Sequence, residues 1–234
     1  MIRIYRTFAI FEWKMIFVSH QLKFNIMATI NNLFDSGQGK LGNLVLYKVG
    51  GQGRVRTRAG HFRDRKSPAQ LAQRQRMQVV NHFLKPFRDL IRITFAAEAM
   101  GGSAVHAARS YNMRHALTGE YPDIAIDKSR ALLSRGPLPL PVGAKASPQP
   151  EGLLIEWENG AEAAGQLPSD TLVVMALSPG NGTVDYRFTG VRRSDGCYLW
   201  KPSLPQENLD IWIAFRNRKE TEMSESLFLK SVTW

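Results

Sequence analysis

Hydrophobic and polar positions alternate with period two in two short segments near the start of the chain. Residues 43–49 read NLVLYKV and residues 54–58 read RVRTR, with GGQG between them. Strict alternation is typical of a half-exposed strand, and glycines supply the positive φ angles that a tight turn needs. The pattern therefore predicts a β-hairpin in which residues 50–53 form the turn.

A helical period begins after Ser67. Ser67 and Pro68 form a strong start signal, because serine caps the first helical turn and proline suits the first helical position. Apolar residues then recur at three- and four-residue spacing and predict a buried face: Val80, Phe83, Leu84, Phe87, Ile91 and Phe95. Pro86 should kink this helix or divide it in two, since proline removes a hydrogen bond and clashes with the preceding turn. A second, shorter helix is predicted over residues 101–119.

From Tyr121 onward the chain changes to short apolar runs separated by Pro, Gly and Asn. Residues 124–134 are interpreted as a strand that leaves the helical part, and the proline-rich residues 135–150 as a linker. Six strands are predicted after it, which favours an antiparallel sandwich: 152–157, 171–177, 184–191, 197–200, 209–215 and 226–232.

The predicted fold class is therefore α+β. An N-terminal β-hairpin plus helices occupies residues 27–135, and an immunoglobulin/fibronectin III-like antiparallel β-sandwich occupies residues 143–234. The aromatic residues of the second region are interpreted as its core.

Charge is distributed unevenly along the 234 residues, whose net charge is +11. Residues 54–92 contain eleven Lys/Arg against two Asp/Glu, a balance of +9, whereas residues 143–234 contain nine against twelve, a balance of −3. Such asymmetry is a recognised sign of a polyanion-facing segment, although solvated basic faces without a partner are common.

The basic residues of this segment fall on two predicted faces. Arg54, Arg56 and Arg58 share one face of their strand, because side chains alternate with period two. This face predicts either an anion site or an edge strand that its charge protects against aggregation. Four more cations recur along the polar side of the helix, which is either a continuation of the same site or a solvated amphipathic face. The candidate polyanion-binding residues are Arg54, Arg56, Arg58, Arg74, Lys85, Arg88 and Arg92.

Glycines 37, 39 and 42 match the spacing G-x-G-x-x-G. A dinucleotide site needs a strand before such glycines and a helix after them, but here a strand follows. We interpret these glycines as structural.

No catalytic motif, cofactor site or metal site is predicted. The five histidines stand alone in the sequence, and the single cysteine, Cys197, excludes an internal disulfide. We therefore expect a protein that is not an enzyme and for which no small-molecule substrate is inferred.

Residues 1–26 are rich in Phe, Ile and Lys, and the patterned part of the chain opens at Met27. We interpret them as a non-native leader, since Glu12 and Lys14 interrupt the apolar region and no cleavage site of a signal peptide follows. No apolar run is long enough to span a bilayer, so we expect a cytoplasmic protein.

Several of these features occur together. Gly39, Gly42 and Asn43 precede a strand with Tyr47, and a Ser67-Pro68 helix start continues as AQLAQRQRM. Trp157 and the pair Ser224/Ser226 follow in the second half. In this combination the chain resembles a family of uncharacterised Bacteroidota proteins classed as a domain of unknown function. The resemblance implies no activity and no functional residues.

The sequence favours a non-enzymatic interaction or assembly protein, whose partner is another protein or a second copy of the chain. The alternative is binding of nucleic acid or another polyanion through residues 54–92. Against this alternative, the basic stripe lacks the interleaved aromatic residues of a single-strand binder.

Overall fold

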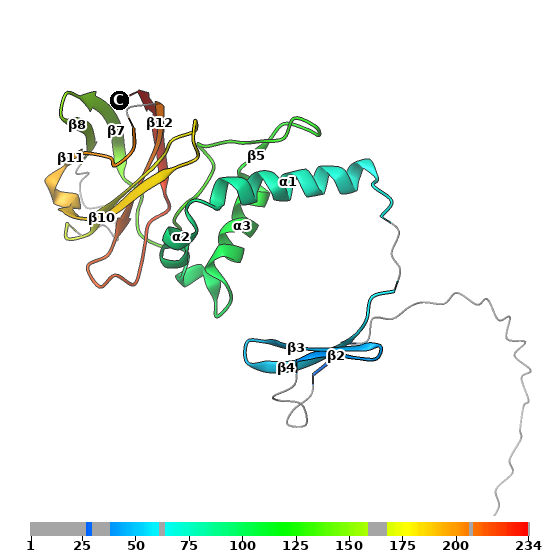
Figure 1. The fold of residues 1–234 in the computed structure, drawn as a ribbon. Helices are drawn as coiled ribbons and strands as arrows, with labels where there is room; N and C mark the ends of the chain where they lie inside the picture. The colour runs from blue at the N-terminus through cyan, green and yellow to red at the C-terminus, as the bar shows by residue number, and fades with distance from the viewer. Residues whose placement is uncertain (1–26, 30–37, 61–63, 159–167, 206–207, 234) are drawn as a thin grey trace, which may run out of the picture. The chain divides into compact units, whose positions relative to one another are not determined.

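A computed structural model describes residues 27–29, 38–60, 64–158, 168–205 and 208–233. The chain divides into two compact units, residues 1–65 and 66–234 (Figure 1). The expected leader, residues 1–26, lies outside the described residues, as does Gly37.

The first unit contains one antiparallel sheet of four strands in the order β1-β4-β3-β2. The predicted hairpin is present, and its turn consists of Gly50 and Gly51, both with positive φ. A short strand that the sequence pattern did not predict precedes it, and the turn between the two contains Gly42 at φ 58°. Gly42, Gly50 and Gly51 therefore serve the turns of a meander, whereas Gly39 is the first residue of a strand. The strands are β1 (Met27–Thr29), β2 (Gly39–Leu41), β3 (Leu44–Val49) and β4 (Gln52–Thr57).

The second unit begins with the predicted helices. Ser67 and Gln70 form a reciprocal capping box, in which the Gln70 N–H donates to the Ser67 hydroxyl. The helix ends before Pro86 and a second one follows, so the prediction of a divided helix is confirmed. All six residues of the predicted apolar face are buried. The helical elements are α1 (Pro68–Leu84), α2 (Arg88–Thr94), the 3-10 turn η1 (Ala97–Ala99) and α3 (Ala104–His115).

The segment predicted as a strand over residues 124–134 is mostly not one. Only β6 (Ala125–Ile126) is a strand there, and it pairs with β5 (Leu117–Thr118). Residues 131–134 are instead tied to the last part of the chain. The Leu133 N–H donates to the Ser226 hydroxyl at 2.8 Å, and the Ser134 hydroxyl donates to the Ser224 carbonyl at 2.8 Å.

Seven strands form two antiparallel sheets in the rest of the unit. One sheet has the order β10-β9-β12-β13 and the other the order β11-β8-β7. All six predicted strands are found, and the proline-rich segment predicted as a linker contains a seventh, β7. The strands are β7 (Val142–Gln149), β8 (Gly152–Glu158), β9 (Thr171–Leu177), β10 (Val184–Arg192), β11 (Cys197–Trp200), β12 (Asn208–Arg216) and β13 (Leu227–Thr233).

Strands β9 and β12 are buried on both faces. Leu172 and Val174 of β9 belong to the core between the two sheets, together with Trp157 and Phe215. The alternate residues of the same strands, such as Trp212, pack against the helices instead. The unit is therefore layered, with helices on one face of the four-stranded sheet and the three-stranded sheet on the other (Figure 1).

Because of this layering, the boundary between the two units of the chain differs from the predicted domain boundary. The sequence predicted a boundary between residues 135 and 143, but the helices share a hydrophobic core with the four-stranded sheet of the sandwich, and the observed division falls between Arg65 and Lys66. The reason is that β9 and β12 are apolar on both faces, so the four-stranded sheet needs a cover on each side.

Candidate anion-binding site

The seven candidate basic residues are divided between the two units. Arg54, Arg56 and Arg58 belong to the first unit, and Arg74, Lys85, Arg88 and Arg92 to the second. The predicted continuity of the two groups is therefore not established.

Arg54 and Arg56 lie on β4, in the interior of the sheet, and Arg58 follows the last residue of that strand, Thr57. Strand β4 pairs with β3 on one side and with β1 on the other, so the charges of Arg54 and Arg56 do not protect an edge. The register places Arg54 opposite Tyr47 and Arg56 opposite Val45, on one face of the sheet. The Arg56 guanidinium lies 5.9 Å from the centre of the Tyr47 ring. This face of the sheet therefore combines cations with one aromatic ring. The sequence pattern did not indicate the ring, because Tyr47 lies on the neighbouring strand.

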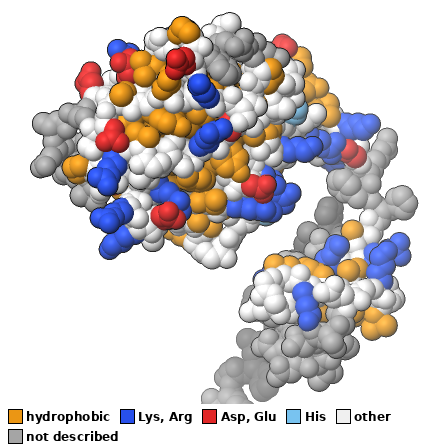
Figure 2. All heavy atoms as spheres, turned by 60° about the vertical axis from the view of Figure 1, so that its left-hand side comes forward, with side chains coloured by type: hydrophobic (Ala, Val, Ile, Leu, Met, Phe, Trp, Pro, Cys, Tyr) orange, Lys and Arg blue, Asp and Glu red, His pale blue; other side chains and the backbone are white. Residues whose placement is uncertain are grey.

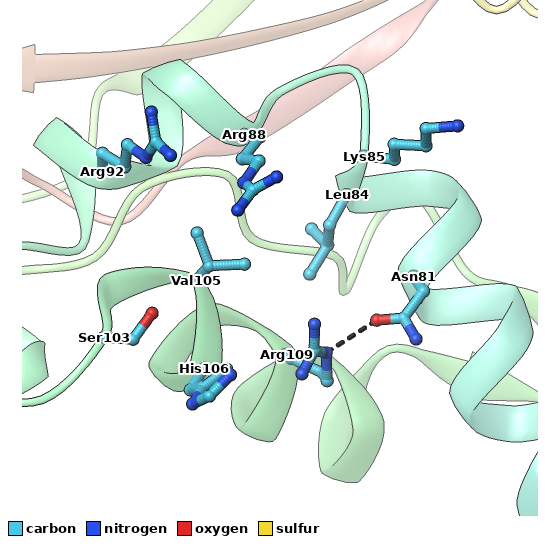
Figure 3. A pocket seen from close by; sticks show the side chains of 9 residues that line it. All are labelled: Asn81, Leu84, Lys85, Arg88, Arg92, Ser103, Val105, His106 and Arg109. Carbon is cyan, nitrogen blue, oxygen red and sulfur yellow. Dashed lines mark hydrogen bonds between the residues drawn. The ribbon is translucent and has the colours of Figure 1, made fainter. Parts of the chain in front are cut away.

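Helices α1, α2 and α3 pack together in the second unit and line an open hollow of about 380 Å³, which we call the basic hollow (Figure 3). Three of the candidate residues line it, and Arg74 does not. Its lining contains four Lys/Arg and no Asp or Glu. The lining residues are Asn81, Leu84, Lys85, Arg88, Arg92, Ser103, Val105, His106 and Arg109.

The cations of the basic hollow differ in how they are paired. Arg92 forms an exposed ion pair with Asp89, Nη1 to Oδ1 at 2.9 Å. Arg109 is half-buried, and its Nε donates to the Asn81 Oδ1 at 2.6 Å. Asparagine is neutral, so this bond orients the guanidinium without compensating its charge. Within the described part of the chain, no carboxylate lies in ion-pair range of Arg109, Arg88 or Lys85.

Figure 3 shows how these side chains are directed. Arg88, from the start of α2, and Arg109, from α3, point into the hollow from different helices, whereas Lys85 points away from it. Leu84 and Val105 form an apolar floor beside them. Two guanidinium groups, that of the exposed Arg88 and that of the half-buried Arg109, therefore converge on a partly apolar space.

Comparison with known proteins identifies a family for this chain. A model described as "Family of unknown function (DUF6266)" matches residues 36–230. The chain belongs to this family. The matched region includes strands β2–β4 and all residues of the basic hollow. Searches of curated proteins and of solved structures found no match.

Family membership confirms the resemblance to a domain of unknown function. The match specifies neither a phylum nor an activity, so the Bacteroidota assignment stays a prediction.

Two residues of the basic hollow with nitrogen-bearing basic side chains, His106 and Arg109, were not among the candidates predicted from the sequence. Both lie on α3, three residues apart, which is the spacing of neighbours on one helix face. The sequence alone shows that the two residues share a helix face. It does not show that this face packs beside α1 and α2. Asn81 was not among the candidate residues either.

No group of three or more His, Cys, Asp or Glu that could hold a metal ion occurs in the ranges that the structure describes. Cys197 is free and exposed. None of the described helices has the length and apolar character required to cross a membrane. On the face drawn in Figure 2, basic and acidic side chains are interspersed over the second unit.

Proposed function

We propose that the protein is a non-enzymatic interaction protein whose partner is an anionic polymer, with nucleic acid as the first candidate. The observation that supports this proposal is the basic hollow, since its lining combines four Lys/Arg with no carboxylate. Like charges held together repel one another, and an anion relieves this repulsion. Phosphates along a polymer backbone supply such anions at regular spacing.

The strand arginines provide a second point of contact for the same polymer. They are carried by a different unit of the chain, and two weak sites on one chain bind a long ligand more tightly than either alone. Tyr47, on the same face, offers a ring on which an unpaired base could stack.

The proposal is tested by titrating single-stranded and duplex oligonucleotides at increasing salt, with fluorescence anisotropy as the measurement. For duplex DNA we expect log K to fall with log salt by about 0.9 per contacted phosphate. The triple variant Arg54→Gln/Arg56→Gln/Arg58→Gln should reduce this slope by about one unit per lost contact. A matched control changes three exposed cations of the second unit, Arg130→Gln/Lys201→Gln/Arg218→Gln, and should leave the slope unaltered. Absence of binding to either nucleic acid at low salt would contradict the proposal.

A finer fold assignment belongs to the same proposal: β7 to β13 form a fibronectin III-like sandwich. Of the seven strands in chain order, the first, second and fifth make one sheet, and the third, fourth, sixth and seventh make the other. This is the strand distribution of fibronectin type III domains, which serve as binding modules or spacers. Here the helices cover the outer face of the four-stranded sheet.

Self-assembly is a second candidate, and the other face of the first unit favours it. No side chain of β2, β3 or β4 is buried, and Leu41 and Leu44 are 61% and 42% exposed. Leu44, Leu46 and Val55 lie on the face opposite the arginines. A sheet needs a covered apolar face to be stable. A second copy of the chain supplies an identical face, and packing the two together leaves both arginine faces outward.

The expected dimer is weak. Strands β3 and β4 have six residues each and β1 and β2 have three each. The face therefore spans at most roughly 20 Å by 20 Å, and two such faces bury at most about 800 Å², below the ~1,200 Å² of a stable interface. Light scattering should therefore show a concentration-dependent dimer. Leu44→Lys should shift the protein to the monomer, and Thr57→Lys, opposite Leu44 on the same face, should do the same. A protein that stays monomeric at every concentration would exclude this candidate.

A further inference from the structure

We infer that the basic hollow is a specific site for one phosphate group, held between Arg88 and Arg109, with Asn81 as the residue that positions Arg109. The proposed function concerns a polymer and several weak contacts. This inference deepens it, because it assigns one defined subsite and its ligand chemistry, and in naming a nucleic-acid backbone as one source it rests on the proposed function.

The first argument is the uncompensated charge. Asp89 pairs with Arg92 at the rim, whereas Arg88, Arg109 and Lys85 have no carboxylate partner in the part of the chain that the structure describes. One surface arginine elsewhere in this unit, Arg135, reaches Glu98 at 3.1 Å and Glu225 at 3.6 Å. The hollow differs from the surroundings of Arg135 because its lining holds four Lys/Arg and no carboxylate.

The second argument is the orientation of Arg109. Its Nε is engaged by Asn81, which leaves both terminal nitrogens for a ligand in the hollow. A guanidinium presents two parallel N–H groups, and this fork matches two oxygens of a phosphate. Because Arg109 is half-buried, it loses less hydration on binding than an exposed cation would. Arg88 approaches from the other helix and supplies a second fork (Figure 3).

The third argument is the size and the surroundings of the hollow. About 380 Å³ is at the small end of ligand pockets, which suits a phosphate and the group attached to it. Ser103 lines the hollow at the start of the 12-residue helix α3, and its hydroxyl makes no capping bond. A helix start carries a partial positive charge, which adds to the field of the arginines.

The phosphate has two sources that share this chemistry. One is an internal phosphodiester of a nucleic acid, and the other is the terminal monoester of a small molecule. Both are accepted by the same pair of guanidinium forks, so the experiment includes a probe for each.

The test uses the full chain with inorganic phosphate as the first probe, measured by isothermal titration calorimetry against chloride at equal ionic strength. We expect saturable binding of one phosphate per chain to the wild type. Arg88→Gln and Arg109→Gln should each weaken it about tenfold or more, because each removes a charged fork. Arg76→Gln, on the same helix as Asn81 and outside the hollow, is the matched control and should bind as the wild type does.

Variants of Asn81 test whether phosphate binding depends on the orientation of Arg109 or only on the presence of its charge. Asn81→Asp keeps the size of the side chain and its bond to Arg109 but adds a negative charge, so phosphate binding should be lost while the chain remains folded. Asn81→Ala keeps every cation and frees Arg109, which should weaken binding by a smaller factor. Melting curves without phosphate establish that each variant is folded. Equal binding by wild type, Asn81→Asp and Arg109→Gln would overturn the inference.

An oligonucleotide without terminal phosphates, as competitor, distinguishes the two sources. Displacement of inorganic phosphate by this oligonucleotide assigns the site to a nucleic-acid backbone. Phosphate binding without displacement assigns it to a small monoester, and in that case the inference stands while the polymer function fails in the salt titration. Conversely, oligonucleotide binding that depends on the strand arginines, with no phosphate binding to the hollow, overturns the inference and leaves the proposed function in place.

Discussion

Replacing Trp212 by alanine is expected to lower the free energy of unfolding of residues 66–234 by about 3–5 kcal/mol. Trp212 is fully buried in the core that joins β12 to the helices. Its ring centre lies 5.9 Å from that of Phe83, 6.3 Å from that of Phe87 and 5.0 Å from that of Phe228. The Nε1–H also donates to the Lys128 carbonyl at 3.2 Å. Alanine leaves a cavity at the junction of two layers, which rigid neighbours fill only in part.

The same variant tests whether helices and sandwich form one cooperative unit. With a shared core, the helical circular dichroism signal and the tryptophan fluorescence should be lost in one transition, in the wild type and in the variant. The melting temperature of the variant should fall by about 10 °C, since each kcal/mol shifts a domain of this size by ~2–4 °C.

Trp212→Phe is the matched control for this experiment. It keeps an aromatic ring and loses the N–H donor, so its effect should be smaller than that of alanine. Loss of the helical signal at lower denaturant than the sheet signal would contradict a shared core. It would instead support the boundary near residue 135 that the sequence predicted.

The sequence predicted most elements because their signals are local. Ser67 and Pro68 mark the start of α1, Pro86 divides the helices, and the alternation in residues 43–58 gives the hairpin. Each of these features depends on steric limits or hydrogen bonds within a few residues. For the same reason the six strands of the second half were found at nearly their observed bounds.

The domain boundary was not marked by any turn or capping signal near it. It was indicated instead by the composition of two strands elsewhere in the chain. Residues 171–177 read TLVVMAL and residues 209–215 read LDIWIAF. These runs are apolar at nearly every position, as in strands covered on both faces, whereas a sandwich strand alternates. Read in this way, they predict a third layer above the sandwich. Strand β7 was missed because Pro141 and Pro148 suggested a linker, yet proline is tolerated at an edge, and β7 is the edge of its sheet.

The candidate site was predictable only in part for a similar reason. Lys85, Arg88 and Arg92 follow helical spacing and could be assigned to one face. Arg109 is as basic in the sequence as many exposed arginines, and what distinguishes it is the neutral partner Asn81, 28 residues away along the chain. Such a contact depends on how α3 packs against α1, which no periodicity in either helix specifies.

Replacing Asp170 by alanine is expected to cost about 3–5 kcal/mol of stability, because it leaves the charge of Arg193 buried without its partner. Asp170 is fully buried and Arg193 is 5% exposed, and the Arg193 Nε lies 3.5 Å from the Asp170 Oδ2. Burial lowers the pKa of the Arg193 guanidinium, and the charge of Asp170 acts in the opposite direction. The remaining contacts are a bond from Nη2 to the Pro139 carbonyl at 2.9 Å and the Phe215 ring, 3.8 Å away.

A second ion pair with the same N–O distance shows how much of the expected loss of stability is due to burial. The Lys145 Nζ also lies 3.5 Å from a carboxylate oxygen, that of Glu156, but both side chains are exposed. Lys145→Ala should therefore cost less than about 1 kcal/mol in the same urea denaturation experiment. The double variant Asp170→Ala/Arg193→Met should recover most of the loss caused by Asp170→Ala, since it removes the buried charge together with its partner. Equal losses from Asp170→Ala and Lys145→Ala would mean that Arg193 finds another partner or water when Asp170 is removed. In that case the pair does not anchor the turn before β11 to the sandwich core.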